Sequence, residues 1–497
     1  MRDLLTDPMC RAEDLGKPLP PMPYGVSVCL PLWEHVVGYE EKAPAILSHF
    51  QSGYPRFFCP PSVTALFSAA EKEFAKDGER AIVFPRMVHA DRCAAFVKAQ
   101  SGRDAKLQEF GPDQWGAVIL PDTATYDVAR RYWRHCGEVV SARQCDAFLG
   151  KATETYSKEE GYAAVQKIKA RLAEHSGQKE EDVFLFPSGM AAIYAVYRMV
   201  SHLFPGRKSV QLDFPYTDVL KVQQLFGSGV HFLPFVDDAD YERLRQILRQ
   251  EPVSGFFAEL PSNPLLKCVD LRRVSEMLFA EERDAPIIVD DTVATSVNMD
   301  AFLLADVVTT SLTKTFSGVG DVLAGSVILN SDSPYREEFS QFLRQYHDNE
   351  LWYGDAIVLE KNSRQFAERA RTMSRNSIAM YEFLSEHPAV ERVHHSLEDR
   401  SGIYEHLLKP DGGHGCLVSV VLKDRAKSAP VYDAMEFSKG PSLGTDFTLV
   451  CPYTLLAHYD ELDWADSCGV DKHLLRISCG IEPAEVIIER MKKALEA

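Results

Sequence analysis

The sequence has few of the features that mark membrane, nucleic-acid-binding or disulfide-rich proteins. None of its apolar runs approaches the roughly twenty residues that a membrane-spanning helix needs. Its formal net charge of −18 disfavours nucleic acid and anionic membranes as partners, because both require a concentrated basic face. Its 11 cysteines include no CxxC pair, so we expect reduced, mostly buried thiols and no metal site or disulfide framework.

The amino terminus also lacks the apolar core of a signal peptide. Its first 20 residues carry Asp3, Asp7, Glu13 and Asp14, whereas organellar transit peptides are poor in acids. We therefore expect a cytoplasmic protein. An anionic ligand of so acidic a chain would need a local basic pocket.

The chain does contain enough residues for more than one domain. Its 497 residues exceed one ordinary core, and 45% hydrophobic with 25% charged residues is typical of soluble globular proteins. Residues 1–60 are rich in proline and aromatics, which predicts an extended, irregular arm. We predict a large domain over residues 61–375, including an accessory insertion at 61–150, and a smaller α/β domain over 376–497.

Strand-like and helix-like runs alternate clearly in the middle of the chain. Helices are predicted at residues 162–175 and 190–204, and strands at 183–186, 209–212, 230–233, 255–260, 286–290 and 307–310. This order predicts an α/β fold with a mostly parallel sheet covered on both faces. Ligands of such sheets bind beyond the carboxyl ends of the strands, where we expect Ser188, Asn263, Asp290 and Lys314.

Lys314 directly follows the apolar, β-branched strand at 307–310. A lysine at the end of a buried strand needs a partner or a reaction to offset its desolvation. Such a lysine suits a Schiff base with a carbonyl compound, and the nearby hydroxyls of Ser311 and Thr313 can hold a phosphate. The alternative is a solvated lysine at a strand-to-loop junction.

Other polar residues follow the neighbouring strands. Ser188 and Gly189 open a helix whose amides can hold an anion, although such a turn is more often just a tight connection. Tyr216 can stack on a planar ligand or lie in the core. Asp290 ends a buried strand, where a carboxylate needs a cation, and the sequence offers no convincing set of further metal ligands.

Two arginines are candidates for binding anions. Arg476 lies in an apolar strand, where it can bind a carboxylate or form a structural ion pair. Tyr54 and Arg56 are two residues apart in an extended segment and can face one anion together, unless Arg56 is an exposed surface residue.

As a set, these residues resemble the Cys/Met-metabolism family of pyridoxal-phosphate enzymes, the cystathionine γ-synthase group. The resemblance runs from about Ser27 to the end, with 61–150 as an insertion relative to the compact members. The motif around residues 452–459 is most similar to the fungal branch. The matching stretches are Tyr54-Pro-Arg56, Ser188-Gly-Met-Ala-Ala192, Tyr216, Ser262-Asn-Pro-Leu-Leu266, Val289-Asp-Asp-Thr292, Ser311-Leu-Thr-Lys314, Ser442-Leu-Gly444 and Arg476-Ile-Ser-Cys-Gly-Ile-Glu482.

The resemblance implies an aminotransferase-like fold, pyridoxal 5′-phosphate (PLP) as cofactor, and a role for each matching residue. Lys314 would form the Schiff base and, with Tyr216, would be catalytic. Asp290 would pair with the pyridine nitrogen, Tyr216 would stack on the ring, and Asn263 would contact the ring hydroxyl. The phosphate would be held by Ser188, Gly189, Met190, Ser311 and Thr313, and by Tyr54 and Arg56 of a neighbouring subunit.

This sharing of Tyr54 and Arg56 implies a homodimer or a tetramer. Arg476 and the backbone of Ser442 and Leu443 would bind the carboxylate of a small amino-acid substrate. The expected reaction is a γ-replacement on an activated homoserine, O-acetyl-L-homoserine, with cysteine as nucleophile and cystathionine as product. Alternatives are a carbon or amine nucleophile in secondary metabolism, a cystathionine lyase, or a non-catalytic paralogue.

The chain departs from compact family members at two places. It has Asp291 where they usually have asparagine, and Gly444-Thr-Asp-Phe-Thr448 where they have Gly-Gly-Val-Glu-Ser. We expect the second stretch to lie near the substrate, which leaves the nucleophile less certain than the cofactor chemistry.

Overall fold

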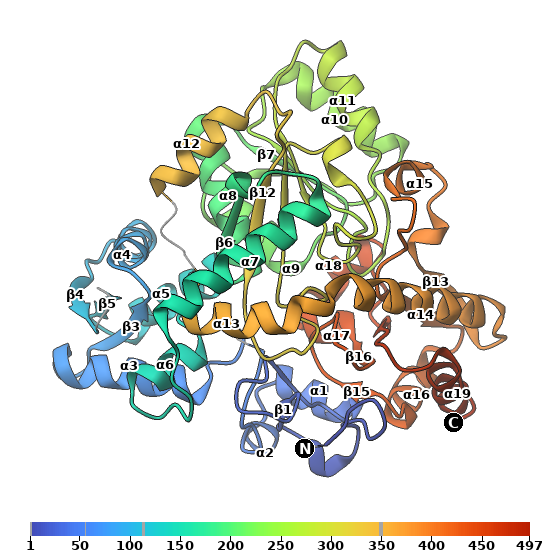
Figure 1. Cartoon of the computed structure of the whole chain (residues 1–497), viewed down its shortest axis with the longest axis horizontal. Coiled ribbons are helices and arrows are strands. Elements are labelled where there is room, and N and C mark those ends of the chain that lie inside the picture. Colours follow the sequence, from blue (N-terminus) through green and yellow to red (C-terminus); the bar gives the residue numbers. More distant parts are fainter. Residues whose placement is uncertain (1, 55, 112–114, 347–350) are drawn as a thin grey trace.

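The computed structural model describes residues 2–54, 56–111, 115–346 and 351–497 (Figure 1). At its centre is a sheet with the strand order β6-β12-β11-β10-β9-β7-β8. These strands are β6 (Val183–Phe186), β7 (Ser209–Leu212), β8 (Val230–Leu233), β9 (Phe256–Glu259), β10 (Ile287–Asp290), β11 (Val307–Thr310) and β12 (Gly325–Leu329). Strand β12 is antiparallel to both neighbours, and the other pairings are parallel. The expected mostly parallel sheet is confirmed, with β12 as a strand that the sequence did not reveal.

Helices cover both faces of this sheet because its strands are apolar on both sides. Along β10, Ile288 packs into an apolar cluster with α8 (Gly189–Leu203). The next residue, Val289, packs into a second cluster with α10 (Asp238–Gln250) and α11 (Leu271–Ala280), as the two-residue period of a strand requires. Further helices of this region are α7 (Lys158–Ser176), α9 (Thr217–Leu225), α12 (Arg336–Tyr346) and α13 (Tyr353–Asn362).

The accessory segment forms a small antiparallel sheet with helices, drawn in blue to cyan in Figure 1. Its elements are α3 (Pro61–Phe74), β3 (Arg80–Phe84), α4 (Met87–Ser101), β4 (Lys106–Phe110), β5 (Trp115–Leu120), α5 (Thr123–Cys136) and α6 (Ala142–Phe148). Trp133 of α5 and Tyr194 of α8 belong to the same apolar cluster. The accessory segment therefore shares a core with the helix that begins at Gly189.

The carboxyl-terminal part contains a second sheet with the order β13-β14-β17-β16-β15. Its strands are β13 (Val390–His394), β14 (Leu417–Leu422), β15 (Ser438–Lys439), β16 (Leu449–Pro452) and β17 (Leu475–Ser478). Its helices are α14 (Phe366–Glu386), α15 (Ile403–Leu407), α16 (Ser428–Ala434), α17 (Tyr453–Ala457), α18 (Leu462–Ser467) and α19 (Ala484–Leu495).

The prediction that residues 1–60 are extended and irregular is wrong in part. They include a two-stranded pairing of β1 (Pro18–Leu19) with β2 (Ser27–Val28), and the helices α1 (Trp33–Glu40) and α2 (Pro44–Leu47). The sequence of α1 contains no proline, and Pro44 occupies the first position of α2, where a helix does not need the missing N–H. Proline content alone therefore understated the regular structure of the arm.

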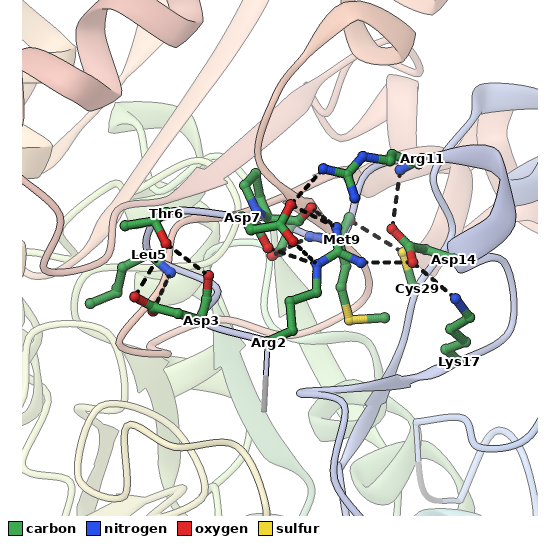
Figure 2. Close-up of polar contacts among 12 residues, drawn as sticks. Arg2, Asp3, Leu5, Thr6, Asp7, Met9, Arg11, Asp14, Lys17 and Cys29 are labelled. Atoms are coloured by element: carbon green, nitrogen blue, oxygen red, sulfur yellow. Dashed lines mark hydrogen bonds and ion pairs between the residues drawn. The ribbon is translucent and has the colours of Figure 1, made fainter.

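The arm is fixed to the carboxyl-terminal part of its own chain. The backbone N–H of Leu30 donates to the carbonyl of Lys439 at 2.9 Å. Figure 2 shows contacts within the arm, in which the buried carboxylate of Asp14 accepts from Arg2 Nη1 at 2.8 Å and from Lys17 Nζ at 3.2 Å. These contacts determine where the end of the arm emerges. Among the described residues, no helix is long and apolar enough to cross a membrane.

Candidate active site

A pocket at the carboxyl ends of the large sheet collects the residues that the sequence singled out. Its walls come from loops after the strands, from the arm, and from the carboxyl-terminal sheet. The predicted site residues in its lining are Tyr54, Arg56, Ser188, Gly189, Met190, Tyr216, Asn263, Asp290, Ser311, Thr313, Lys314, Ser442, Leu443 and Arg476.

Lys314 lies in the loop after β11 with 8% of its surface exposed, so it is not a solvated lysine. Its Nζ donates to Tyr54 Oη at 2.9 Å and to Ser442 Oγ at 3.1 Å. Burial raises the pKa of Tyr54, but the charges of Lys314 and Arg56 outweigh it and hold that pKa below its ordinary value. The amine is therefore held inside the pocket by two hydroxyl groups.

Gly444 lets the segment from the second domain approach this lysine. Its φ is +69°, and a Cβ there would lie 2.5 Å from the backbone nitrogen of Thr315. Ser442 is on the segment that carries Gly444, and Lys314 is on the segment that this glycine contacts. A larger residue at position 444 would therefore move Ser442 away from Lys314.

Asp290 presents a buried carboxylate at the end of β10. Its Oδ1 accepts from the N–H of Thr292 at 2.9 Å, and no lysine, arginine or histidine within the described ranges forms an ion pair with it. Burial raises its pKa. A positively charged ligand atom would stabilise this carboxylate, whereas the next residue, Asp291, points away and accepts from Thr310 Oγ1 at 2.5 Å.

The first residues of helix α8 form another part of the pocket wall. Ser188 is its N-cap, with Oγ accepting from the N–H of Ala191 at 3.1 Å and donating to the carbonyl of Gly137 at 2.9 Å. Gly189 sits so close to Ser311 that a Cβ would lie 2.7 Å from it. The free amides and the dipole of this helix start favour a phosphate here.

The hydroxyl of Thr313 forms hydrogen bonds within the chain. Its hydroxyl donates to the carbonyl of Ala324 at 3.3 Å and accepts from the N–H of the same residue at 3.0 Å. It lines the pocket while holding the loop of Lys314 against the start of β12.

Tyr54 and Arg56 line the pocket beside Lys314 within this single chain. Arg56 is buried, forms an ion pair with Asp218, and donates from Nη2 to Tyr216 Oη at 3.0 Å. Because the arm is fixed to the carboxyl-terminal part of the same chain, its end emerges beside this pocket. Pro55, between them, lies outside the described residues.

Arg476 forms the other end of the pocket, on β17. Its Nη1 donates to Asn263 Oδ1 at 3.0 Å and its Nη2 to the carbonyl of Ser442 at 2.6 Å. No carboxylate within the described part of the chain forms an ion pair with this buried guanidinium. The structural ion pair considered as an alternative is therefore wrong, and Arg476 has its charge available for an anionic ligand.

Sequence reasoning missed several residues of the pocket. Glu259 ends β9 directly opposite Asp290 in the sheet register, and accepts from the N–H groups of Tyr216 and Asn263 at 2.6 and 3.0 Å. Burial and the neighbouring Asp290 raise its pKa. Its position at a strand end was a usable signal. By contrast, Glu40 of α1 carried no signal, because only the folded arm brings it to the pocket.

The stretch expected beside the substrate, residues 444–448, does not line the described pocket, although the two residues before it do. Ser442 and Leu443 line the pocket, but Asp446 and Phe447 do not. Asp446 forms an ion pair with Arg369, and Phe447 packs in an apolar cluster with residues of the arm. The residues that differ from the compact members therefore contact α14 and the arm and do not form the pocket wall.

Comparison with known proteins decides what kind of site this is. The family described as Cys/Met metabolism PLP-dependent enzyme matches residues 156–496. The chain belongs to this family. A second family, the N-terminal domain of fungal trans-sulfuration enzymes, matches residues 62–141, which is most of the accessory segment.

Relatives in the Cys/Met metabolism family match almost the whole chain. Cystathionine gamma-synthase of Neurospora crassa is 31% identical, with 97% of this chain and 98% of that protein covered. A cystathionine gamma-synthase-like enzyme of Amanita muscaria is 30% identical, with 97% and 96% covered. The crystal structure of a cystathione gamma lyase from Micromonospora echinospora shares the fold, with a TM-score of 0.58, 23% identity, and 67% of this chain and 86% of that chain covered.

The pocket fits the cofactor of the Cys/Met metabolism family. The carboxylate of Asp290, which has no cationic partner among the described residues, suits a protonated pyridine nitrogen. The start of α8 suits a phosphate, and the buried amine of Lys314 suits an aldehyde. The protein is thus a PLP-dependent enzyme that acts on small amino-acid substrates.

Proposed function

We propose that this enzyme catalyses γ-replacement on O-acetyl-L-homoserine, with cysteine as nucleophile and cystathionine as product. The observation that carries the proposal is the match to a cystathionine gamma-synthase over almost the full length of both chains. The pocket is consistent with it, since Arg476 has no carboxylate partner of its own in the described ranges and suits the carboxylate of an amino acid.

The proposed roles follow from the positions of the side chains. PLP, when bound, supplies an electron sink for the bonds at the substrate's α and β carbons. Lys314 removes the proton at Cα and moves a proton at Cβ, while Tyr54 and Ser442 orient its amine. Asp290 keeps the pyridine nitrogen protonated, and Arg476 with the backbone of Ser442 and Leu443 holds the substrate carboxylate.

Tyr216, Asn263 and the start of α8 complete the proposed cofactor site. With PLP bound, Tyr216 would stack on the ring and Asn263 would contact the ring hydroxyl. The residues that would hold its phosphate all line the pocket, namely Ser188, Gly189, Met190, Ser311, Thr313, Tyr54 and Arg56. Asn263 is kept in place from both ends, because Glu259 accepts from its N–H and Arg476 donates to its side chain.

A second candidate is the same γ-replacement with a carbon or amine nucleophile in secondary metabolism. It is considered because the chain is about as similar to the enzyme of Amanita muscaria, whose name calls it cystathionine gamma-synthase-like and specifies no nucleophile. A cystathionine lyase is the third candidate. We further propose that the enzyme works in the cytoplasm as a homodimer or homotetramer.

The test is product analysis with purified protein. Incubation with O-acetyl-L-homoserine and a panel of thiol, amine and carbon nucleophiles should release acetate and give cystathionine with cysteine, identified by mass. Substitution Lys314→Ala should abolish turnover and the visible absorbance of the bound cofactor. If wild-type protein never releases acetate, the γ-replacement proposal is wrong, and cleavage of cystathionine in the same assay would instead support the lyase.

A further inference from the structure

We infer that the end of α5, residues 134–137 of the accessory segment, is a clamp that positions the phosphate-binding end of the cofactor pocket. This inference deepens the cofactor site and rests on the proposed phosphate role of Arg56. It assigns a purpose to the segment that distinguishes this chain from the compact members of its family.

The clamp contacts residues of the site at three places. The carbonyl of Arg134 accepts from Arg56 Nη1 at 2.6 Å. The Nδ1 atom of His135 lies 3.0 Å from Asp218 Oδ1, and Asp218 pairs with Arg56 through its other oxygen. The carbonyl of Gly137 accepts from Ser188 Oγ at 2.9 Å, at the start of α8.

The contact between His135 and Asp218 is shielded from solvent. His135 and Asp218 are 8% and 0% exposed, so solvent does not substitute for a missing partner. Burial raises the pKa of Asp218, but Arg56 and His135 outweigh it and hold that pKa well below its ordinary value. Since an ionised carboxylate only accepts hydrogen bonds, the proton between them is on His135 Nδ1.

This network orients Arg56 and leaves some of its N–H groups available to a ligand. It donates to Asp218 and Arg134 from Nη1 and to Tyr216 from Nη2. Of the five N–H groups that a guanidinium carries, the described residues thus leave Nε–H and one Nη2–H for an anion. Asp218 lies in the first turn of α9, two residues after Tyr216, so one arginine ties together the arm, α5 and the ring-stacking tyrosine.

Gly137 shows how closely the clamp approaches the start of α8. Its φ is +70°, and a Cβ would lie 2.6 Å from the backbone nitrogen of Ala191 and 2.7 Å from Ser188 Oγ. Only glycine meets both requirements at this position. The accessory segment therefore ends in direct contact with the helix start proposed to hold the phosphate.

The experiment compares two ligands that differ only in the phosphate. Full-length protein is freed of PLP with hydroxylamine, and the dissociation constants of PLP and of pyridoxal are measured by tryptophan fluorescence. His135→Ala, and His135→Leu as a variant that retains volume, should weaken PLP by about tenfold, the effect of losing a hydrogen bond to a charged group. Pyridoxal should change by less than about twofold.

Matched variants separate the clamp from a merely structural role. His135→Asn keeps a donor near the position of Nδ1 and should restore PLP binding. Arg131→Ala, on the exposed face of the same helix, should leave both constants unchanged. Equal weakening of both ligands by His135→Ala and His135→Leu, or no weakening of PLP, would overturn the clamp.

Arg56→Ala distinguishes failure of the clamp from failure of the site. If Arg56→Ala weakens PLP and not pyridoxal while the His135 variants do neither, the clamp alone is wrong. If Arg56→Ala affects both ligands equally, the phosphate role of Arg56 is wrong, and the clamp is wrong with it.

Discussion

At the scale of single residues, the two consecutive carboxylates at the end of β10 have different partners. Asp290 faces the pocket and has no cationic partner among the described residues, whereas Asp291 is buried against Thr310. Burial raises the pKa of Asp291 to about 7. Only Asp290 is therefore placed to contact the cofactor. Burying the ionised form of Asp291 lowers the stability of the folded protein.

Asp291→Asn should stabilise the protein in a pH-dependent way. The folded protein retains a proton on Asp291 that the unfolded chain loses above its ordinary pKa of 3.8, so stability from this group falls as pH rises from about 4 to 7. The amide can still accept from Thr310 and does not titrate. The gain in the free energy of unfolding should grow by about 2 kcal/mol between pH 5.5 and pH 8.

This pH dependence is measured as the difference in thermal unfolding between Asp291→Asn and wild type. A difference that stays constant from pH 5.5 to pH 8 would contradict the raised pKa. Thr310→Val, which removes the hydrogen bond to Asp291 and keeps the carboxyl, should lower stability over the same range.

At the scale of elements, the start of α8 connects the accessory segment to the cofactor pocket. Ser188 caps the helix and also holds the carbonyl of Gly137, so it joins the accessory segment to the large sheet. Ser157 caps α7 in the same way, with Oγ accepting from the N–H of Glu160 at 3.3 Å, but α7 starts away from the pocket lining. The two serines form a natural comparison.

Ser188→Ala and Ser157→Ala should each cost about 1 kcal/mol of stability through the lost cap. Only Ser188→Ala should weaken PLP binding, because only that helix start lines the pocket. Thermal unfolding and PLP titration of the two variants check this. Equal effects on PLP affinity would show that general destabilisation, and not the helix start, controls the cofactor.

At the scale of the whole molecule, the arm completes the pocket of the chain that carries it. The arm is anchored to the second sheet of its own chain, and Arg56 forms an ion pair with Asp218 of α9. Each chain thus provides the lysine, the aspartate and both arginines of a site. We therefore predict that an oligomer does not divide these residues among its subunits.

Co-expression of Lys314→Ala chains with Arg56→Ala chains tests this arrangement. We expect no activity above the sum of the separate variants, since no pocket then contains both Lys314 and Arg56. Recovery toward about a quarter of wild-type activity, the share expected for a symmetric dimer with exchanged arms, would show that the arms cross between subunits. Tagged chains and a pull-down confirm that mixed oligomers form.

The strands and the residues at their ends could be predicted from the sequence. The boundaries predicted for residues 183–186, 209–212, 230–233 and 307–310 agree with β6, β7, β8 and β11. They follow from short apolar, β-branched runs bounded by polar turns, which are local properties of the chain. Lys314 and Asp290 could be found for the same reason, because the carboxyl end of a parallel strand is where ligands bind.

Tertiary structure alone decided which distant residues meet at the pocket. Glu40 comes from the arm and His135 from the accessory segment, and each reaches the site only after α1 and α5 pack against other elements. Strand β12 joins the sheet by pairing with β6, far away in sequence. Packing and long-range hydrogen bonds depend on the whole fold, so sequence alone determined the cofactor chemistry and tertiary structure decided how Arg56 is held.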